Sequence, residues 1–224
     1  MPLKAVLFDL DGTLVDSVPD LRRVLAAVMA EEGFEAPTLA ETRAMVGDGA
    51  GILVRRAFAA KGAEAGDDAQ TRRLARFLAF YTAEPCVLTT AYPGALDLLA
   101  DLRRRGLRLA VCTNKPQAPT EGLMEALGLA SLVDCTIGGD ALPVKKPDPG
   151  HVRGVLDRLG VAAGEAVFVG DGANDVAAAQ AAGLACILVS FGYTKTPARE
   201  LGADAVVDRL SDLPAAFERL AAAA

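Results

Sequence analysis

Short apolar segments alternate with amphipathic segments along most of this sequence, and glycines stand where the amphipathic segments end. Amphipathic patterns that stop at Gly106, Gly128 and Gly160 are typical of helices of ordinary length. The apolar segments predict strands at residues 4–8, 107–112, 136–137, 166–169, 185–189 and 205–207. Strands that alternate with helices form an open parallel sheet with helices on both faces. We therefore predict an α/β fold with a Rossmann-like, doubly wound parallel sheet as its core.

One long segment, residues 17–86, breaks this alternation. Roughly 70 residues there carry helical patterns and no convincing strand, which is too long for an ordinary crossover connection. Apolar residues recur at helical spacing over 21–29, and Thr38 with Glu41 predicts a capping box that opens a second helix. We predict an inserted all-helical domain of residues 17–86 and an α/β core domain of residues 1–16 and 87–224.

The composition argues against several classes of function. Hydrophobic residues make up 52 % of the 224 positions, so a sizeable core can form, while the net charge of −6 argues against a nucleic-acid binder. The longest apolar stretch, residues 176–191, contains Gln180 and Gly183, which predicts a helix, a stop and a strand and no membrane span. Asp9 and Asp11 interrupt the first apolar run, which is unlike a signal peptide. The cysteines show no Cys-x-x-Cys spacing, so we expect reduced thiols and a cytoplasmic protein.

The first predicted strand runs directly into Asp9 and Asp11, two carboxylates separated by one residue. Nothing in folding requires this pair, because like charges at the edge of a core repel each other and lose hydration. A Mg²⁺ ion would make the pair favourable, since it takes carboxylate, phosphate and water oxygens as ligands. The alternative is that both residues only form a turn with Gly12, because Asp-Gly is a common turn pair.

Other polar residues follow the later strands. Thr113 and Asp171 each come at or next to the end of an apolar run, as Asp9 does. In an open parallel sheet these strand ends share one edge, where ligands bind near the point at which the strand order reverses. We expect these side chains to share one rim. Lys146 lies in a proline-rich loop that can hold an ammonium group there, and Asp175 follows Asp171 across a strand-to-helix turn.

In these motifs the sequence resembles the haloacid dehalogenase superfamily of phosphohydrolases. The four motifs occur in order as Asp9-Leu10-Asp11-Gly12-Thr13, Thr113-Asn114, Lys146-Pro147, and Gly170-Asp171 with Asp175. The resemblance covers the whole chain, and the inserted helices resemble the helical type of cap. Finer features resemble the phosphoglycolate phosphatase branch: Val46-Gly47-Asp48-Gly49, Tyr92-Pro93-Gly94, Thr113-Asn114-Lys115-Pro116, Gly138-Gly139-Asp140 and Lys146-Pro147-Asp148-Pro149.

The resemblance implies a phosphomonoester hydrolase that forms an aspartyl-phosphate, with 2-phosphoglycolate as substrate and glycolate and phosphate as products. In that mechanism the carboxylate of Asp9 attacks phosphorus. Asp11 protonates the leaving alkoxide and later takes a proton from the attacking water. Lys146 adds positive charge beside Asp9 and the phosphoryl oxygens.

The resemblance also implies the residues that bind metal and substrate. Mg²⁺ would be held by the Asp9 side chain, the Asp11 main-chain oxygen and Asp171, with Asp175 binding directly or through water. The phosphoryl oxygens would be bound by the main-chain amides of Leu10 and Asp11 and the side chains of Thr113, Asn114 and Lys146. The cap would act as a lid that selects the substrate. Four cap cations could meet a substrate carboxylate, although single surface cations are usually only solvated: Arg43, Arg55, Arg56 and Lys61.

Structural roles are also predicted. His151 follows the Pro149-Gly150 turn and is predicted to be a surface residue at a helix start, not a catalyst, because the four motifs already supply acid, base and nucleophile. Asn174 is predicted to cap a helix, and a capping role for Asp175 is an alternative to metal binding.

Several alternative functions stay open at this point. The substrate could be another small phosphorylated metabolite, such as a sugar phosphate, pyrophosphate or a nucleotide. A β-phosphoglucomutase-like phosphosugar mutase would need a long-lived phosphoenzyme and an acid/base in the cap. A true dehalogenase does not need Asp11, because a halide leaves without a proton. A phosphate-sensing interaction protein on the same fold is the non-enzymatic alternative. Either a monomer or a homodimer is compatible with the sequence.

Overall fold

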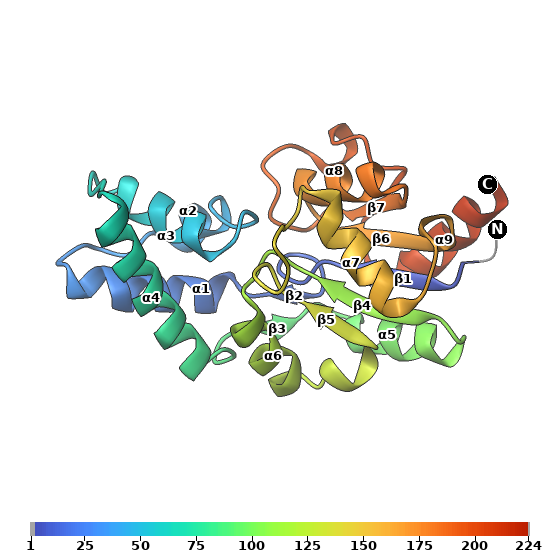
Figure 1. Ribbon diagram of the computed structural model, residues 1–224, viewed down its shortest axis with the longest axis horizontal. Coiled ribbons are helices and arrows are strands. Elements are labelled where there is room, and N and C mark those ends of the chain that lie inside the picture. Colours follow the sequence, from blue (N-terminus) through green and yellow to red (C-terminus); the bar gives the residue numbers. More distant parts are fainter. Residues whose placement is uncertain (1–2, 224) are drawn as a thin grey trace.

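The buried segment Ala5–Phe8 forms strand β1 near the centre of a six-stranded sheet, in a computed structural model that describes residues 3–223 (Figure 1). The strand order is β5-β4-β1-β6-β7-β8, and every pairing is parallel. The other strands are β4 (Arg108–Cys112), β5 (Cys135–Ile137), β6 (Ala166–Gly170), β7 (Ala185–Val189) and β8 (Ala205–Val207). The predicted strands are therefore confirmed.

The strand order reverses between β1 and β6. From β1 the chain builds β4 and β5 on one side, then crosses over to β6, β7 and β8 on the other. In the register of the sheet, Phe8 lies opposite both Val111 and Val169. The residues that follow these three positions consequently emerge at the same edge, at the point where doubly wound folds bind their ligands. The predicted doubly wound fold is confirmed.

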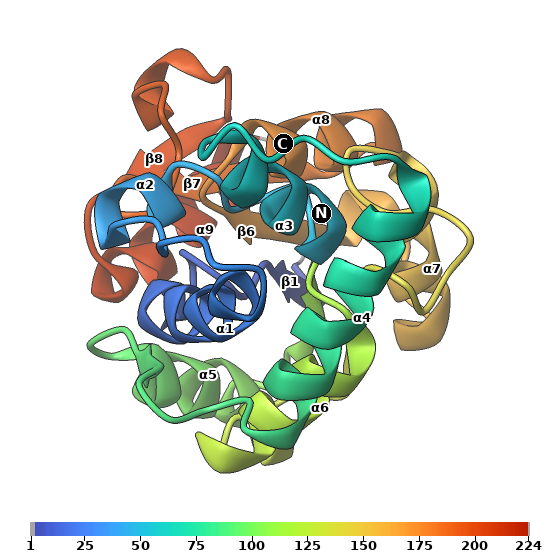
Figure 2. The ribbon, with the colours of Figure 1, turned by 90° about the vertical axis from the view of Figure 1, so that its left-hand side faces the viewer.

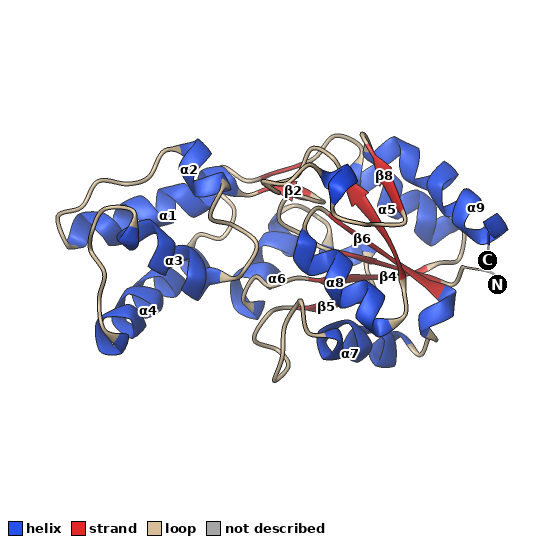
Figure 3. Ribbon diagram, turned by 90° about the horizontal axis from the view of Figure 1, so that it is seen from above, coloured by secondary structure: helices blue, strands red, loops and turns tan. Residues whose placement is uncertain are grey.

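Helices cover both faces of this sheet, as Figure 3 shows from above. Val6 and Phe8 face one apolar cluster, and Ala5 and Leu7 face the other, because successive strand residues point to opposite faces. The first cluster is completed by helices α5 (Ala95–Arg104), α6 (Gln117–Ala126) and α9 (Leu213–Ala223). The second is completed by α7 (Pro149–Leu159) and α8 (Ala173–Ala182). Short 3₁₀ helices span Ala130–Leu132, Ala163–Glu165, Ala198–Glu200 and Leu210–Asp212.

Four helices form a separate bundle beside the edge of the sheet where the functional side chains are expected (Figures 1 and 2). They are α1 (Val18–Glu31), α2 (Leu39–Arg43), α3 (Ala50–Ala59) and α4 (Asp67–Ala83), and we call them the cap. Their apolar faces share a cluster of their own, which includes Leu25, Phe58 and Phe77. The predicted helical insertion is confirmed, as is the capping box of Thr38 and Glu41.

The two connections between core and cap run side by side. Strand β2 (Val15–Asp16) leaves the core and pairs antiparallel with β3 (Thr90–Ala91), which returns to it. Beside this pair, the buried carboxylate of Asp20 accepts hydrogen bonds from the main-chain amides of residues 87–89 and from the Thr89 hydroxyl. The sequence did not predict this pair. The domain boundaries at residues 17 and 86 lie close to it and stay a prediction.

Over residues 3–223, no helix combines the length and the apolar character needed to cross a bilayer.

Candidate active site

The strand ends bring three carboxylates and one lysine together. Asp9 follows β1, Asp171 follows β6, and Asp175 lies in the first turn of α8. Their carboxylate oxygens lie within 4.8 Å of one another. Lys146, from the loop before α7, places Nζ 2.9 Å from Oδ1 of Asp9 and 2.7 Å from Oδ1 of Asp175. We call these four residues the carboxylate cluster. Thr113 follows β4 on the same edge, as the sequence predicts.

Gly12 and Gly192 make room for the Asp171 carboxylate because glycine has no side chain. A Cβ atom at Gly12 or at Gly192 would overlap the Asp171 carboxylate. Gly12 also has a φ of +87°, a conformation that side chains disfavour. With this space available, the main-chain amide of Tyr193 donates to Oδ2 of Asp171 at 2.6 Å.

Asp175 makes the capping contacts that the sequence gave as one alternative, and it also binds Lys146. Its Oδ2 accepts hydrogen bonds from the amides of Asp171 and Gly172, both at 3.0 Å, so it closes the start of α8. Its Oδ1 is bound to Lys146 in the carboxylate cluster. The prediction of Asn174 as the helix cap is wrong, because Gly172 holds that position and Asn174 lies inside the helix. The Asn174 amide instead donates to the Asp48 carboxylate in the cap, at 2.8 Å.

Burial has the largest single effect on the pKa values of Asp9, Asp171 and Lys146. It raises the pKa of Asp9 to about 6, with Lys146 acting in the opposite direction. It raises the pKa of Asp171 well above its usual range, and the charges of Asp175 and Asp9 raise it further. Burial alone would lower the pKa of Lys146, but Asp175 and Asp9 outweigh it and raise that pKa. The carboxylate cluster thus holds three carboxylates and one ammonium, which contacts Asp9 and Asp175.

This excess of negative charge fits a divalent cation. The donor set consists of carboxylate oxygens, which Mg²⁺ prefers, and a cation there would relieve the repulsion that raises the pKa of Asp171.

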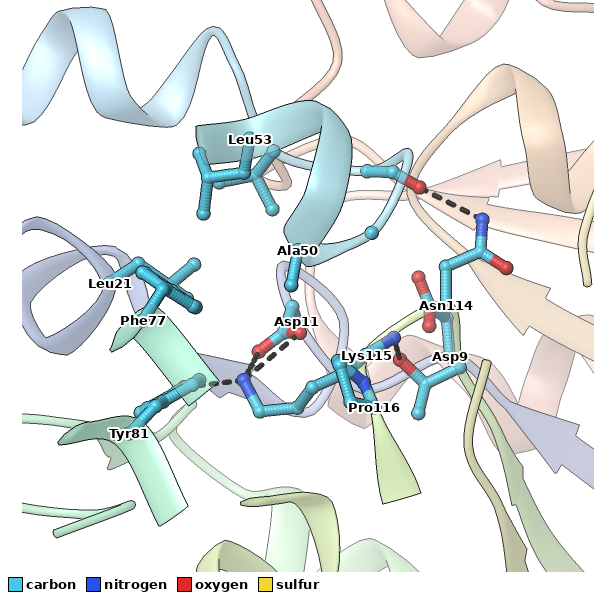
Figure 4. Close-up of a pocket in the computed structure, with 14 residues that line it drawn as sticks. Asp9, Asp11, Leu21, Ala50, Leu53, Phe77, Tyr81, Asn114, Lys115 and Pro116 are labelled. Atoms are coloured by element: carbon cyan, nitrogen blue, oxygen red, sulfur yellow. Dashed lines mark hydrogen bonds and ion pairs between the residues drawn. The ribbon is translucent and has the colours of Figure 1, made fainter. Parts of the chain in front are cut away.

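A second charged pair lies beside the carboxylate cluster. Lys115 Nζ is 2.9 Å from Oδ1 and 3.3 Å from Oδ2 of Asp11, and it also donates to the hydroxyl of Tyr81 in α4. Figure 4 shows the lysine between these two residues. Burial raises the pKa of Tyr81 to about 12, although Lys115 acts to lower it, so the phenol keeps its proton near neutral pH. Lys115 belongs to the Thr113-Asn114-Lys115-Pro116 motif, but the sequence did not predict its contact with Tyr81.

The cap touches the core through the loop that carries Gly47 and Asp48. The Asn114 amide donates to the Gly47 carbonyl at 3.0 Å and to the Lys146 carbonyl at 2.9 Å. Lys145 Nζ donates to the Asp48 carbonyl at 2.6 Å. The Asn114 amide, predicted to bind phosphoryl oxygens, is thus directed at two main-chain carbonyls in this arrangement.

Two adjoining cavities lie between cap and core. Asp9, Asp11, Val46 and Gly47 border both of them. The first extends toward Lys115 and Tyr81, and we call it the lysine cavity. The second extends along the Asp171 and Asp175 side and includes Arg56, Tyr193 and Lys195 in its wall.

The four cap cations that could meet a substrate carboxylate, according to the sequence, lie outside the lysine cavity. Arg43 approaches Asp16 at 3.4 Å, and Arg56 is bound to Asp48 at 2.6 Å. Arg55 and Lys61 are exposed. Within residues 3–223 the lysine cavity therefore takes its positive charge from the core, not from the cap.

The prediction of His151 as a surface residue is wrong. Its side chain is completely buried, and Nε2 lies 3.2 Å from the Gly138 carbonyl. Burial, followed by the charge of Lys146, lowers the pKa of His151 to about 4. The signal was its spacing from Val155 and Leu159, which places all three on the buried face of α7.

Comparison with known proteins agrees with the resemblance found in the sequence. A model of the haloacid dehalogenase-like hydrolases matches residues 3–183. The phosphoglycolate phosphatase of Rhodospirillum rubrum is 50 % identical over 214 residues, which cover 94 % of this chain and 89 % of that protein. Phosphoglycolate phosphatase 1 of Pseudomonas aeruginosa is 40 % identical over 213 residues, covering 94 % and 78 %.

Solved structures agree as well. A crystal structure of a predicted phosphoglycolate phosphatase from Haemophilus somnus matches with a TM-score of 0.89 at 29 % identity, over 96 % of this chain and 98 % of that chain. CbbY from Rhodobacter sphaeroides, solved in complex with phosphate, matches with a TM-score of 0.76 at 30 % identity, over 94 % and 96 %. On the strength of the family model and of relatives similar over most of their length, the chain belongs to the haloacid dehalogenase-like hydrolase family.

Proposed function

We propose that this chain is a Mg²⁺-dependent phosphomonoester hydrolase that converts 2-phosphoglycolate and water into glycolate and phosphate. The observation that carries the proposal is the Asp9 carboxylate, whose side chain is 14 % exposed and lies 2.9 Å from Lys146 Nζ, at the point where the strand order of the sheet reverses. The phosphoglycolate phosphatases at up to 50 % identity support the substrate.

Asp9 is the proposed nucleophile. One of its oxygens attacks phosphorus, the bond from phosphorus to the ester oxygen breaks, and an aspartyl-phosphate forms. Water then attacks this phosphorus and restores the carboxylate. With a pKa of about 6, Asp9 is mostly ionised at neutral pH, as attack requires. The buried ammonium of Lys146 offsets negative charge on the phosphoryl oxygens.

Asp11 is the proposed general acid and base. It lines both cavities beside Asp9, on the path of an ester oxygen that leaves toward the cap. It protonates that oxygen and later takes a proton from the attacking water.

When bound, the metal would neutralise part of the negative charge of the phosphate and the carboxylates. Asp9, Asp171 and the main-chain oxygen of Asp11 would hold it. Asp175 would act through water, because Lys146 and the amides at the start of α8 already occupy both of its oxygens.

Thr113 and the amides of Leu10 and Asp11 are the proposed donors to the phosphoryl oxygens. The Thr113 hydroxyl accepts a hydrogen bond from the Lys115 amide at 3.2 Å, which leaves its own proton to donate. We assign Asn114 to holding Lys146 and the cap loop in place, since its amide donates to both.

A phosphate-release assay tests the proposal. The purified protein is incubated with 2-phosphoglycolate, hexose phosphates, pyrophosphate and nucleotides, with Mg²⁺ and with a chelator. We expect 2-phosphoglycolate to give the highest kcat/KM, and activity only with Mg²⁺. A higher value for another substrate would overturn the substrate, and undiminished activity in the chelator would overturn the metal requirement.

A further inference from the structure

The lysine cavity has one charged wall and one apolar end. Within residues 3–223, Lys115 is the cation that lines it, and its side chain is 2 % exposed. Leu21, Leu53 and Phe77 from the cap close the far end (Figure 4). A cationic group has therefore been buried in a mostly apolar chamber that adjoins Asp9.

Burying this ammonium is costly unless its partners compensate. Asp11 and Tyr81 provide partners, yet Asp11 already has a proposed part in proton transfer and does not by itself require a lysine. The other buried ammonium, Lys146, is bound to Asp9 and Asp175 and does not line the lysine cavity. The cap cations do not reach the lysine cavity. Lys115 is thus the group available to a second negative charge on a substrate whose phosphoryl group lies at Asp9.

We propose that Lys115, assisted by the Tyr81 hydroxyl, binds a carboxylate located one carbon from the ester oxygen and so selects the substrate. This inference rests on the proposed function and names the residues of its specificity. Tyr81 accepts a hydrogen bond from Lys115, so its own proton is free to be donated to the carboxylate. Because Tyr81 comes from α4, the contact also requires the cap to be seated on the core.

The apolar end sets the length of the substrate. A two-carbon acid places its carboxylate at Lys115 without entering the space against Leu21, Leu53 and Phe77. A hexose phosphate would drive hydroxyl groups into these side chains, where they find no partners. The same wall therefore disfavours large polar substrates.

Lys115 could alternatively serve only to orient Asp11. The two roles differ in how the effect of a mutation depends on the substrate. A lysine that orients the general acid affects every ester, whereas a lysine that binds a carboxylate affects only esters that carry one. Ethyl phosphate is the matched probe, because it keeps the ester oxygen and both carbons of 2-phosphoglycolate and lacks its carboxylate.

The experiment measures the ratio of kcat/KM for 2-phosphoglycolate to that for ethyl phosphate. In Lys115→Met we expect the ratio to fall about 10- to 100-fold, the loss typical of a buried charged hydrogen-bond partner. In Tyr81→Phe we expect a smaller fall in the same direction. Lys61→Met is the matched control, because it removes an exposed cap lysine, and its ratio should equal that of the wild type.

An unchanged ratio in Lys115→Met, with both values reduced equally, would overturn the inference and leave the proposed function intact. Absence of phosphate release from both esters by the wild type would instead overturn the proposed function.

If Lys115→Met does not fold, a second substrate tests the inference with the wild type alone. Phosphoethanolamine places an ammonium where the carboxylate would lie, and we expect its kcat/KM to be lower than that of ethyl phosphate. A higher value would contradict the inference.

Discussion

Lys146 Nζ lies 2.9 Å from Oδ1 of Asp9, and the lysine side chain is almost completely buried. The same ammonium reaches Asp175 at 2.7 Å, so one cation holds two carboxylates at the edge of the sheet. In the proposed mechanism this arrangement lets an anionic side chain approach an anionic phosphoryl group.

Replacement of Lys146 tests whether this ammonium is needed. In Lys146→Met we expect kcat to fall by at least about 10³-fold, because the nucleophile and the phosphoryl oxygens lose their positive partner. The variant should also lose about 3–5 kcal/mol of unfolding free energy, measured by urea unfolding, since the carboxylates of Asp9 and Asp175 lose their ammonium partner. Lys145→Met is the control, because Lys145 is exposed and contacts the cap loop, not the carboxylate cluster. Equal losses in both variants would contradict the account.

Asp11→Asn tests the proton transfer. The variant should fold and bind Mg²⁺ normally, because the proposed metal ligand is its main-chain oxygen, yet lose about 10²–10⁴-fold in turnover of an alkyl phosphate. The loss should be smaller for an aryl phosphate, since phenolate leaves with less need of a proton. Stopped-assay kcat values on both substrates provide the measurement. Near-normal turnover of the alkyl phosphate would exclude Asp11 as acid and base.

The glycines around Asp171 give a test of the metal site that mutates none of the proposed ligand residues. A methyl group in Gly192→Ala would overlap the Asp171 carboxylate and displace it. We expect the Mg²⁺ concentration for half-maximal activity to rise about 10- to 100-fold, as for other changes beside metal ligands. Gly66→Ala adds the same methyl group in open space and should leave that concentration unchanged. The same metal dependence in both variants would argue against Asp171 as a ligand.

Asp20 gives a prediction about acid stability. Burial acts to raise the pKa of its carboxyl, but hydrogen bonds from Arg23, Thr89 and the neighbouring amides outweigh burial and hold that pKa below its usual range. Because the folded-state pKa is depressed, the stabilisation is complete above the unfolded pKa near 3.8 and is lost as the pH falls through the folded value.

We therefore expect Asp20→Asn to lower the unfolding free energy at pH 7 by about 1–3 kcal/mol and to flatten its dependence on pH below about 4. Urea unfolding at several pH values provides the measurement. Asp157→Asn, at an exposed position on α7, is the control. A parallel pH dependence of the Asp20→Asn variant and the wild type would show that Asp20 is not the group that titrates.

The fold could be predicted because its signals are local and repeated. Strands such as Ala185–Val189 are apolar on both faces, and glycines such as Gly160 end the helices in a left-handed conformation. The β2–β3 pair could not be predicted, because each strand has only two residues and the pairing depends on where the cap sits.

The site was predictable where it depends on strand ends and not where it depends on cap contacts. Asp9 and Asp171 share a rim because parallel strands place their carboxyl ends at one edge. The contact of Lys115 with Tyr81 joins a core loop to a cap helix, so no spacing within the sequence encodes it. The burial of His151 was misjudged because its position after a Pro-Gly turn outweighed its helical spacing with Val155.

Trapping the phosphoryl group on the protein is the most direct test of the central claim. Wild-type protein is mixed with 2-phosphoglycolate and Mg²⁺, quenched in acid within milliseconds, digested and examined by mass spectrometry. The account predicts one additional phosphoryl group on the peptide that contains Asp9, labile to hydroxylamine, and none in Asp9→Asn. A phosphoryl group on another residue, or full turnover by Asp9→Asn, would contradict it.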